Sequence, residues 1–358
     1  MTVTYIPILS VRPAEIIALS ELPDLSKDGM TPLVLIKPWL GAGPLARALD
    51  KVQNGFPSRE WFAELDPEYE PSASSETYAE IQRLRDRTDG FSNWIDFVKQ
   101  LPHAIPVLQL RGIASAADIL DQVNNAAALG RGVCIRIERK TIGVEALIDV
   151  ISERNDVFFT VVIDYGQQDS RLLVNAVPAI KDVNYIRGKI PSAQIVLSST
   201  TFPSGFSSSS QEIYERSFFN IVDGEVGQLI FSDRGSARAL EQGGGGIPRP
   251  RIDLPSQSHW SFFRSDCVRE AHESLEDFRV RRIEAYGAMA DAAVNSQDWD
   301  ANLNIWGTQL IKITQLRSPF GITSPAKATA CRINIHLTRQ AFYGVDISKD
   351  ELEEDWVD

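Results

Sequence analysis

Three apolar runs follow one another between residues 131 and 201, and helix-forming segments separate them. The runs cover residues 133–137, 158–164 and 194–199. Each is rich in β-branched or aromatic residues and is apolar almost without a break, which is typical of a parallel strand buried on both faces. Strand, helix and strand at this spacing predict βαβ units with right-handed crossovers.

The same pattern recurs along the rest of the first 240 residues. Five more strands are predicted, at residues 5–9, 32–37, 60–66, 104–110 and 227–233. Eight strands that alternate with helices predict an α/β fold, and specifically a closed (β/α)8 TIM-like barrel over residues 1–300. An open, doubly wound sheet is the alternative, although no GxGxxG motif follows any of the strands.

A different composition follows the eighth strand. Residues 243–246 are four glycines and predict a hinge, and residues 248–251 predict a lid or rim loop. Helices are predicted at residues 266–293, 303–313 and 332–342. We expect residues 301–358 to form a C-terminal helical extension packed on the barrel, ending in a solvated acidic tail at residues 350–358.

Composition restricts the class of partner. The chain has 358 residues and a formal net charge of −12, which argues against an extended nucleic-acid surface but is compatible with a local basic pocket. No apolar run approaches the ~18 residues of a membrane span. The three cysteines form no CxxC pair, and the four histidines form no HxH or HExxH motif. A cytoplasmic protein without a histidine-based metal site is predicted.

The carboxyl ends of the predicted strands carry polar side chains. In a parallel barrel these ends meet at one mouth, where the functional site lies, and charges there need partners or water. We predict Asp164, Arg136 and Lys37 as the catalytic group, with Lys37 and Arg136 holding an anion such as phosphate. Gln109, Ser198 and Ser199 are predicted to form hydrogen bonds with the ligand.

Three carboxylates at the same ends suggest a divalent cation, with Asp66, Asp164 and Asp233 as its ligands. Structural roles are open alternatives. Arg136 can form an ion pair with Asp164 or Glu138, Asp164 can cap the next turn, and Asp233 can pair with Arg234 or act as an N-cap. The serines near residue 198 lack the GxSxG elbow of a serine hydrolase.

Short segments spread over residues 3–340 resemble the "beta protein" family of tailed phages and bacteria. They are Tyr5-Ile6-Pro7-Ile8-Leu9 with Glu15, Thr31-Pro32-Leu33, Ile105-Pro106-Val107, Val162-Ile163-Asp164, Ser198-Ser199-Thr200-Thr201-Phe202-Pro203 and Asn334-Ile335-His336-Leu337-Thr338. The resemblance implies a phage or anti-phage setting. It implies no settled activity and transfers no catalytic residue.

Two functions follow from these observations. The first is a barrel that binds a small anionic or nucleotide-like ligand at the strand ends, with metal-assisted phosphoester hydrolysis as the reaction to test first. The second is a non-enzymatic scaffold for protein interactions, with contacts made by the glycine-rich loop and the C-terminal helices. Whether the chain is an enzyme stays open.

Overall fold

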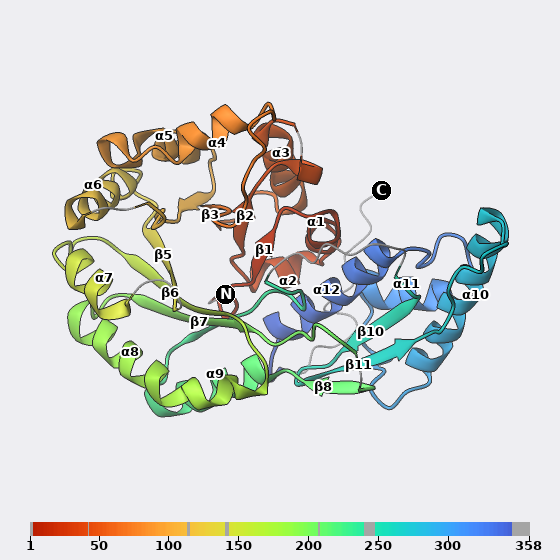
Figure 1. Ribbon diagram of the computed structural model, residues 1–358. Helices are drawn as coiled ribbons and strands as arrows, with labels where there is room; N and C mark the ends of the chain where they lie inside the picture. Colours follow the sequence, from red (N-terminus) through yellow and green to blue (C-terminus); the bar gives the residue numbers. More distant parts are fainter. Residues whose placement is uncertain are drawn as a thin grey trace.

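Eight parallel strands form two four-stranded sheets in the computed structural model, which describes residues 3–41, 43–112, 115–139, 143–206, 208–239 and 248–345 (Figure 1). The first sheet contains β1 (Ile8–Ser10), β2 (Leu33–Ile36), β3 (Trp61–Leu65) and β4 (Ala104–Pro106), in that order. The second contains β5 (Val133–Glu138), β6 (Phe159–Gln167), β7 (Gln194–Thr200) and β9 (Ile230–Ser232). The mixed α/β class with parallel strands is confirmed.

Helices connect these strands and lie along the outer side of the two sheets (Figure 1). They are α1 (Pro13–Ser20), α2 (Asp24–Asp28), α3 (Leu45–Gly55), α4 (Tyr78–Leu84), α5 (Thr88–Lys99), α6 (Ala116–Ala127), α7 (Val144–Ile151), α8 (Ala176–Lys189) and α9 (Tyr214–Val226), with the short 3-10 helices η1 (Trp39–Gly41) and η2 (Ser170–Asn175). Local sequence sets some of their ends. The hydroxyl of Ser115, for example, accepts the backbone N–H of Asp118 at the start of α6, as in a capping box.

The two parallel sheets meet at single residue pairs. Isolated parallel bridges join Val107 to Cys134, and Tyr5 to Phe231. A continuous ladder through all eight strands is not found among the described residues. Backbone N–H groups of Ile6 and Ile8 also donate to the carbonyls of Phe231 and Asp233, and that of Leu108 donates to the carbonyl of Cys134. The closed TIM-like barrel remains a prediction, because these contacts do not extend into a continuous ladder among the described residues.

Apolar side chains fill both faces of the parallel sheets. In β6, Val161 and Ile163 belong to the largest apolar cluster, which also includes residues of the surrounding helices, whereas Val162 belongs to a smaller one. Neighbouring side chains of a strand point to opposite faces, so two-sided burial explains why the runs are apolar without alternation. The smaller cluster takes a side chain from every parallel strand, including Ile8, Leu33, Phe62, Ile105, Cys134, Val162, Val196 and Ile230.

A third, antiparallel sheet corrects the predicted organisation after the eighth strand. It contains β10 (Arg251–Pro255), β11 (His259–Arg264) and β8 (Ser210–Glu212), in that order, and α10 (Leu275–Val294), α11 (Trp306–Gln315) and α12 (Pro325–Ala341) pack beside it (Figure 1). The predicted rim loop at 248–251 thus ends in a strand, because β11 pairs with it. The predicted helix at 266–293 begins only at Leu275. The glycines at 243–246 and the tail at 350–358 lie outside the described residues.

Helix α12 belongs to two apolar clusters. Its Ile333 and Leu337 lie in the largest cluster, and its Cys331 and Ile335 lie in a second cluster with residues of β10, α10 and α11. The predicted boundary at residue 300 falls between α10 and α11, which share that second cluster, and the division into domains stays a prediction. None of the described helices is long and apolar enough to cross a membrane.

Truncating Leu337 tests whether α12 is part of the core of the parallel sheets. Leu337 is fully buried, so Leu337→Ala should lower the free energy of unfolding by about 2–5 kcal/mol in urea denaturation. The matched control is Leu275→Ala at the exposed start of α10, which should change it by less than about 0.5 kcal/mol. Equal effects of the two substitutions would contradict the packing described above.

Candidate functional site

A cavity of about 600 Å³ lies at the carboxyl ends of the parallel strands. Four of the predicted site residues line it together, namely Lys37 after β2, Asp66 after β3, Arg136 in β5 and Asp164 in β6. Other charged side chains in the lining are Arg12, Glu15, Glu68, Glu70, Glu138, Arg139, Arg234 and Arg238.

Arg136 lies at the centre of a buried ionic network, and its side chain is only 2% exposed. Its Nε and Nη2 each donate to a carboxylate oxygen of Glu64 at 2.7 Å. Its Nη1 donates to Glu138 at 2.6 Å and to Asp164 at 2.8 Å. The structural ion pair, an open alternative for Arg136 in the sequence, is therefore present.

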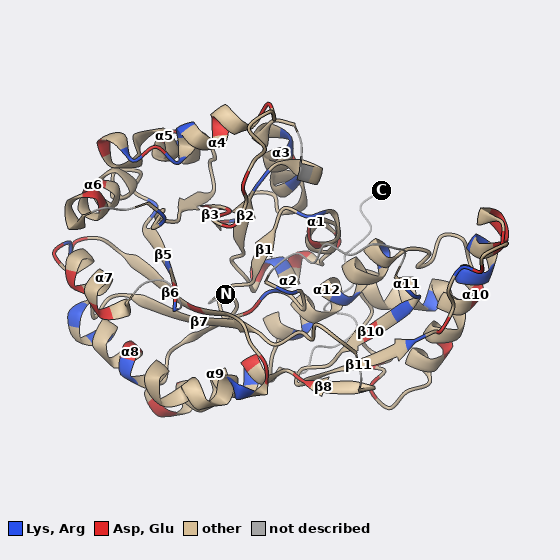
Figure 2. Ribbon diagram, in the orientation of Figure 1, with Lys and Arg blue, Asp and Glu red and all other residues tan. Residues whose placement is uncertain are grey.

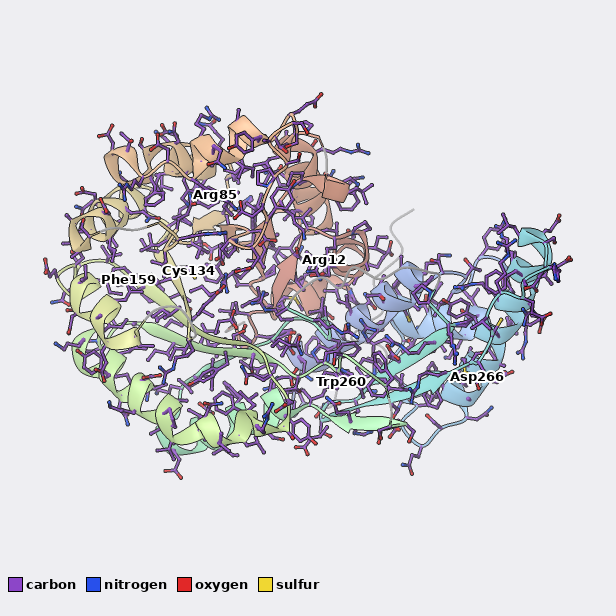
Figure 3. All side chains as sticks on the ribbon, in the orientation of Figure 1. Arg12, Arg85, Cys134, Phe159, Trp260 and Asp266 are labelled. Carbon is purple, nitrogen blue, oxygen red and sulfur yellow. The ribbon has the colours of Figure 1, made fainter. Side chains whose placement is uncertain are left out.

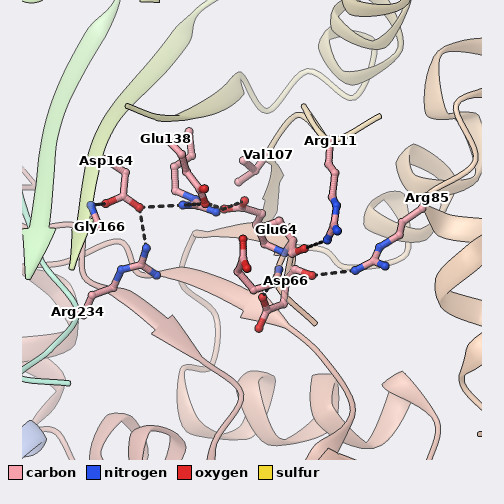
Figure 4. A network of polar contacts seen from close by, with 12 residues as sticks. Glu64, Asp66, Arg85, Val107, Arg111, Glu138, Asp164, Gly166 and Arg234 are labelled. Carbon is pink, nitrogen blue, oxygen red and sulfur yellow. Dashed lines mark hydrogen bonds and ion pairs between the residues drawn. The ribbon is translucent and has the colours of Figure 1, made fainter. Parts of the chain in front are cut away.

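Asp164 joins this network to a second arginine (Figure 4). The Nη2 of Arg234 donates to Oδ2 of Asp164 at 2.6 Å, and the backbone N–H of Gly166 donates to Oδ1 at 2.8 Å. Arg234 follows β9, so the network takes side chains from three strands and one strand end.

Strand geometry accounts for this convergence. Arg136 and Glu138 are two residues apart in β5, so they point to the same face. The parallel register of β5 and β6 places Glu138 opposite Asp164. Glu64 comes from β3, so its contact with Arg136 links the first parallel sheet to the second.

The balance between burial and neighbouring charges sets the protonation state of these groups. Burial raises the pKa of Asp164, but the charges of Arg234 and Arg136 outweigh it and leave the pKa lowered. Burial would lower the pKa of Arg136, yet Glu64 and Asp164 raise it well above its usual value. For Glu64, burial dominates and the pKa is raised despite Arg136. Asp164 and Arg136 are therefore charged at neutral pH.

Two further ion pairs lie in the lining of the cavity. Lys37 Nζ lies 3.8 Å from Asp66 Oδ2, and Arg12 lies 3.2 Å from Glu15. Glu15 also accepts the backbone N–H of Ser10 at 2.6 Å, and burial raises its pKa. Much of the charge in the cavity wall is thus neutralised by neighbouring side chains.

Three buried polar atoms in this lining have no hydrogen-bond partner in the part of the chain that the structure describes. They are Oγ of Ser10, the hydroxyl of Tyr165 and Nε of Arg234. A buried donor without an acceptor carries a desolvation cost. These three atoms are the buried donors of the lining that a ligand could satisfy.

Four of the predicted site residues do not line this cavity. The side-chain amide of Gln109 donates to the carbonyl of Leu84, and its backbone exchanges hydrogen bonds with the side chain of Gln122. Ser198 and Ser199 are buried in β7, away from the lining. The fourth is Asp233, which lies in a separate network.

The three carboxylates predicted to hold a metal do not all line one cavity, because Asp66 and Asp164 line it and Asp233 does not. Asp66 lies beside Lys37, Asp164 is bound by Arg136 and Arg234, and Asp233 is bound elsewhere. Among the residues described, no group of three or more His, Cys, Asp or Glu side chains is arranged to hold a metal ion.

Asp233 forms a second buried network with α12. The hydroxyl of Tyr5 donates to Oδ1 of Asp233 at 2.6 Å, and Nε2 of His336 lies 2.5 Å from Oδ2. His336 stacks on Trp260, which is labelled in Figure 3. The predicted alternative of an Asp233–Arg234 pair is wrong, because Arg234 pairs with Asp164 instead.

Glu215 lies near Asp233 and is fully buried. Burial, and then the charge of Asp233, raise its pKa from the ordinary 4.5 to about 8. The hydroxyl and backbone N–H of Thr201 both donate to its Oε2. This glutamate is therefore held mostly in its neutral form at pH 7.

Comparison with known proteins identifies the family of this chain. A family model described as Beta protein matches residues 5–342, nearly the whole chain. The chain belongs to the Beta protein family. The chain is also 26% identical over 367 residues to Protein beta of Enterobacteria phage P4, and the match covers 98% of each of the two proteins. The predicted family is confirmed, and with it a phage-associated relative.

Sequence reasoning missed several residues of this Beta protein's site, above all Glu64, which binds Arg136, and Arg234, which lines the cavity. One signal was available for Glu64, which is two residues before Asp66 and therefore shares its face of β3. Arg234 follows a predicted strand end directly. Ser10, Arg12 and Glu15 follow the first predicted strand.

Removing the central guanidinium should destabilise the protein strongly. Arg136→Gln leaves buried carboxylates without their counter-charge, which should lower the free energy of unfolding by about 3–5 kcal/mol. Arg171→Gln is the matched control, because its exposed pair with Asp169 should contribute nothing measurable. Urea denaturation of both variants measures the difference, and an unchanged Arg136→Gln would show that the network is not structural.

Glu215 should make stability depend on pH. Because its folded pKa is raised, the folded state holds a proton that the unfolded state releases between pH 4.5 and about 8, so stability falls as pH rises through that window. Glu215→Gln keeps the acceptor oxygen for Thr201 and should flatten this fall. Thermal unfolding from pH 5 to 9 tests it, with the exposed Glu225→Gln on α9 as control. Parallel curves for wild type and Glu215→Gln would rule the effect out.

Proposed function

We propose that this Beta protein binds a small ligand through an anionic group, such as a phosphate, in the cavity at the strand ends. The observation that carries the proposal is Arg234. Its guanidinium is buried in the lining, one nitrogen binds Asp164 and its Nε has no partner among the described residues. A phosphate oxygen would satisfy that donor through a charge-assisted hydrogen bond, and Ser10 Oγ offers another.

The position of Arg234 supports the same ligand class. The apolar cluster with side chains from every parallel strand, together with the two bridges between the sheets, favours a single eight-stranded ring. In such a ring Arg234 and Arg238 would follow the eighth strand, and barrels often bind phosphate in the loops after their last two strands.

The proposal does not include metal-assisted phosphoester hydrolysis. That reaction was predicted from Asp66, Asp164 and Asp233, and each of these carboxylates has a different partner. A setting in phage defence also stays a prediction, derived from the family resemblance.

A protein-interaction scaffold is the second candidate. Two observations favour it: the charges of the cavity are largely paired with one another, and large apolar side chains near the end of α11 face solvent. Leu316 is 78% exposed and Phe320 is 79% exposed. Exposed apolar groups of this size are typical of contact surfaces when they lie together.

Calorimetric titration with inorganic phosphate separates these candidates. Wild-type protein should bind phosphate, and Arg234→Gln should weaken binding by about tenfold or more, the value of one charge-assisted hydrogen bond. The control is Arg249→Gln, whose exposed pair with Asp266 lies outside the cavity lining. Absence of binding in wild type, or equal affinities for wild type and Arg234→Gln, would refute the proposal and leave the scaffold.

A further inference from the structure

A second cavity of about 730 Å³ adjoins the first. Gln167, at the end of β6, lines both cavities. Arg238 lines the first, and it donates to the carbonyl oxygens of Pro203 at 3.0 Å and Ser204 at 2.7 Å, both of which line the second. The boundary between the two cavities therefore includes these two side chains.

Gln167 holds three segments together at this boundary. Its Nε2 donates to the carbonyl of Phe202 at 3.0 Å, and its Oε1 accepts the backbone N–H of Ala239 at 3.2 Å. The end of β6, the loop after β7 and the segment after β9 thus meet where the cavities adjoin. A ligand that reaches past Gln167 would contact both cavities.

The second cavity differs from the first in its chemistry. The charged side chains in its lining, Asp169 and Arg171, pair with each other at 2.7 Å. The rest of the lining is hydroxyl, amide, aromatic and apolar groups. It offers hydrogen bonds without a net charge.

Two glutamines in this lining have a fixed orientation. The amide nitrogen of Gln168 donates to the carbonyl of Tyr165 at 2.6 Å, and that of Gln211 donates to the carbonyl of Thr201 at 2.6 Å. Only the nitrogen of a side-chain amide can donate a hydrogen bond, so the atom that faces each carbonyl is Nε2 and the other atom of the amide is Oε1. Within the described parts of the chain, neither Oε1 has a hydrogen-bond partner, so the cavity offers two acceptors.

We propose that the second cavity binds the uncharged, hydroxyl- or amino-bearing part of the ligand whose anionic group lies beside Arg234. The ligand class is then a sugar phosphate or a nucleotide, with hydroxyl or amino groups donating to Gln168 and Gln211. This inference rests on the proposed function, because it assigns the rest of the same ligand.

Calorimetry with two probes tests it. Wild-type protein is titrated with inorganic phosphate and with ribose 5-phosphate, which adds hydroxyl donors to the same anionic group. Ribose 5-phosphate should bind about tenfold tighter, the effect of one or two additional hydrogen bonds. Gln168→Leu and Gln211→Leu should each remove most of that advantage without changing the affinity for phosphate. Gln309→Leu, on the exposed face of α11, is the control and should change neither affinity.

Three outcomes would overturn the inference. Equal affinities for phosphate and ribose 5-phosphate in wild type would remove the second subsite and leave the proposed function intact. So would an equal loss of both affinities in Gln168→Leu and Gln211→Leu. If wild type binds neither probe, the proposed function fails, and the subsite fails with it.

Discussion

The arrangement of the strand ends depends on neutralising one buried guanidinium, that of Arg136. Moving a charge out of water costs several kcal/mol, and only well-placed partners offset this cost. The partners of Arg136 come from β3, β5 and β6. The contact with Glu64 is a bidentate pair between the two parallel sheets. It therefore constrains the relative position of the sheets in addition to the few backbone hydrogen bonds between them.

This constraint also shapes the chemistry of the cavity. Because the charges in the wall are largely paired, the formal charge of the lining does not attract an anion by itself. Among the described residues, the buried lining atoms that remain for a ligand are Nε of Arg234 and the hydroxyls of Ser10 and Tyr165. Positively and negatively charged residues are interspersed along the chain, and α8 and α10 each carry both signs (Figure 2). Recognition in the cavity therefore depends on specific donors rather than on a broad field.

Much of the parallel part of the fold could be predicted from the sequence. Two-sided burial gives a strong local signal, so all eight parallel strands were placed near their true positions. Four residues that were selected because they lie at predicted strand ends line one cavity, namely Lys37, Asp66, Arg136 and Asp164. Contacts between distant residues could not be predicted, because Arg136 and Glu64 are 72 residues apart and Asp233 and His336 are 103 residues apart. No local pattern identifies such pairs.

Other errors have similar causes. A polar residue at a strand end need not face the cavity: Gln109 is held by Leu84 and Gln122, and Ser198 and Ser199 are enclosed in β7. The antiparallel sheet was missed because β10 follows a proline-rich segment and is stabilised by its pairing with β11. Tertiary context overrides local preference in such strands.

A double-mutant cycle between Arg136 and Glu64 tests most directly whether their ion pair links the two parallel sheets. It uses Arg136→Met, Glu64→Leu and the double variant. If their ion pair links the two sheets, the free energies of unfolding should be strongly non-additive, with a coupling energy of about 1–3 kcal/mol. The double variant should then be more stable than Arg136→Met alone, because it removes one buried carboxylate that has lost its partner. Additive effects of the two substitutions would show that the network does not hold the sheets together.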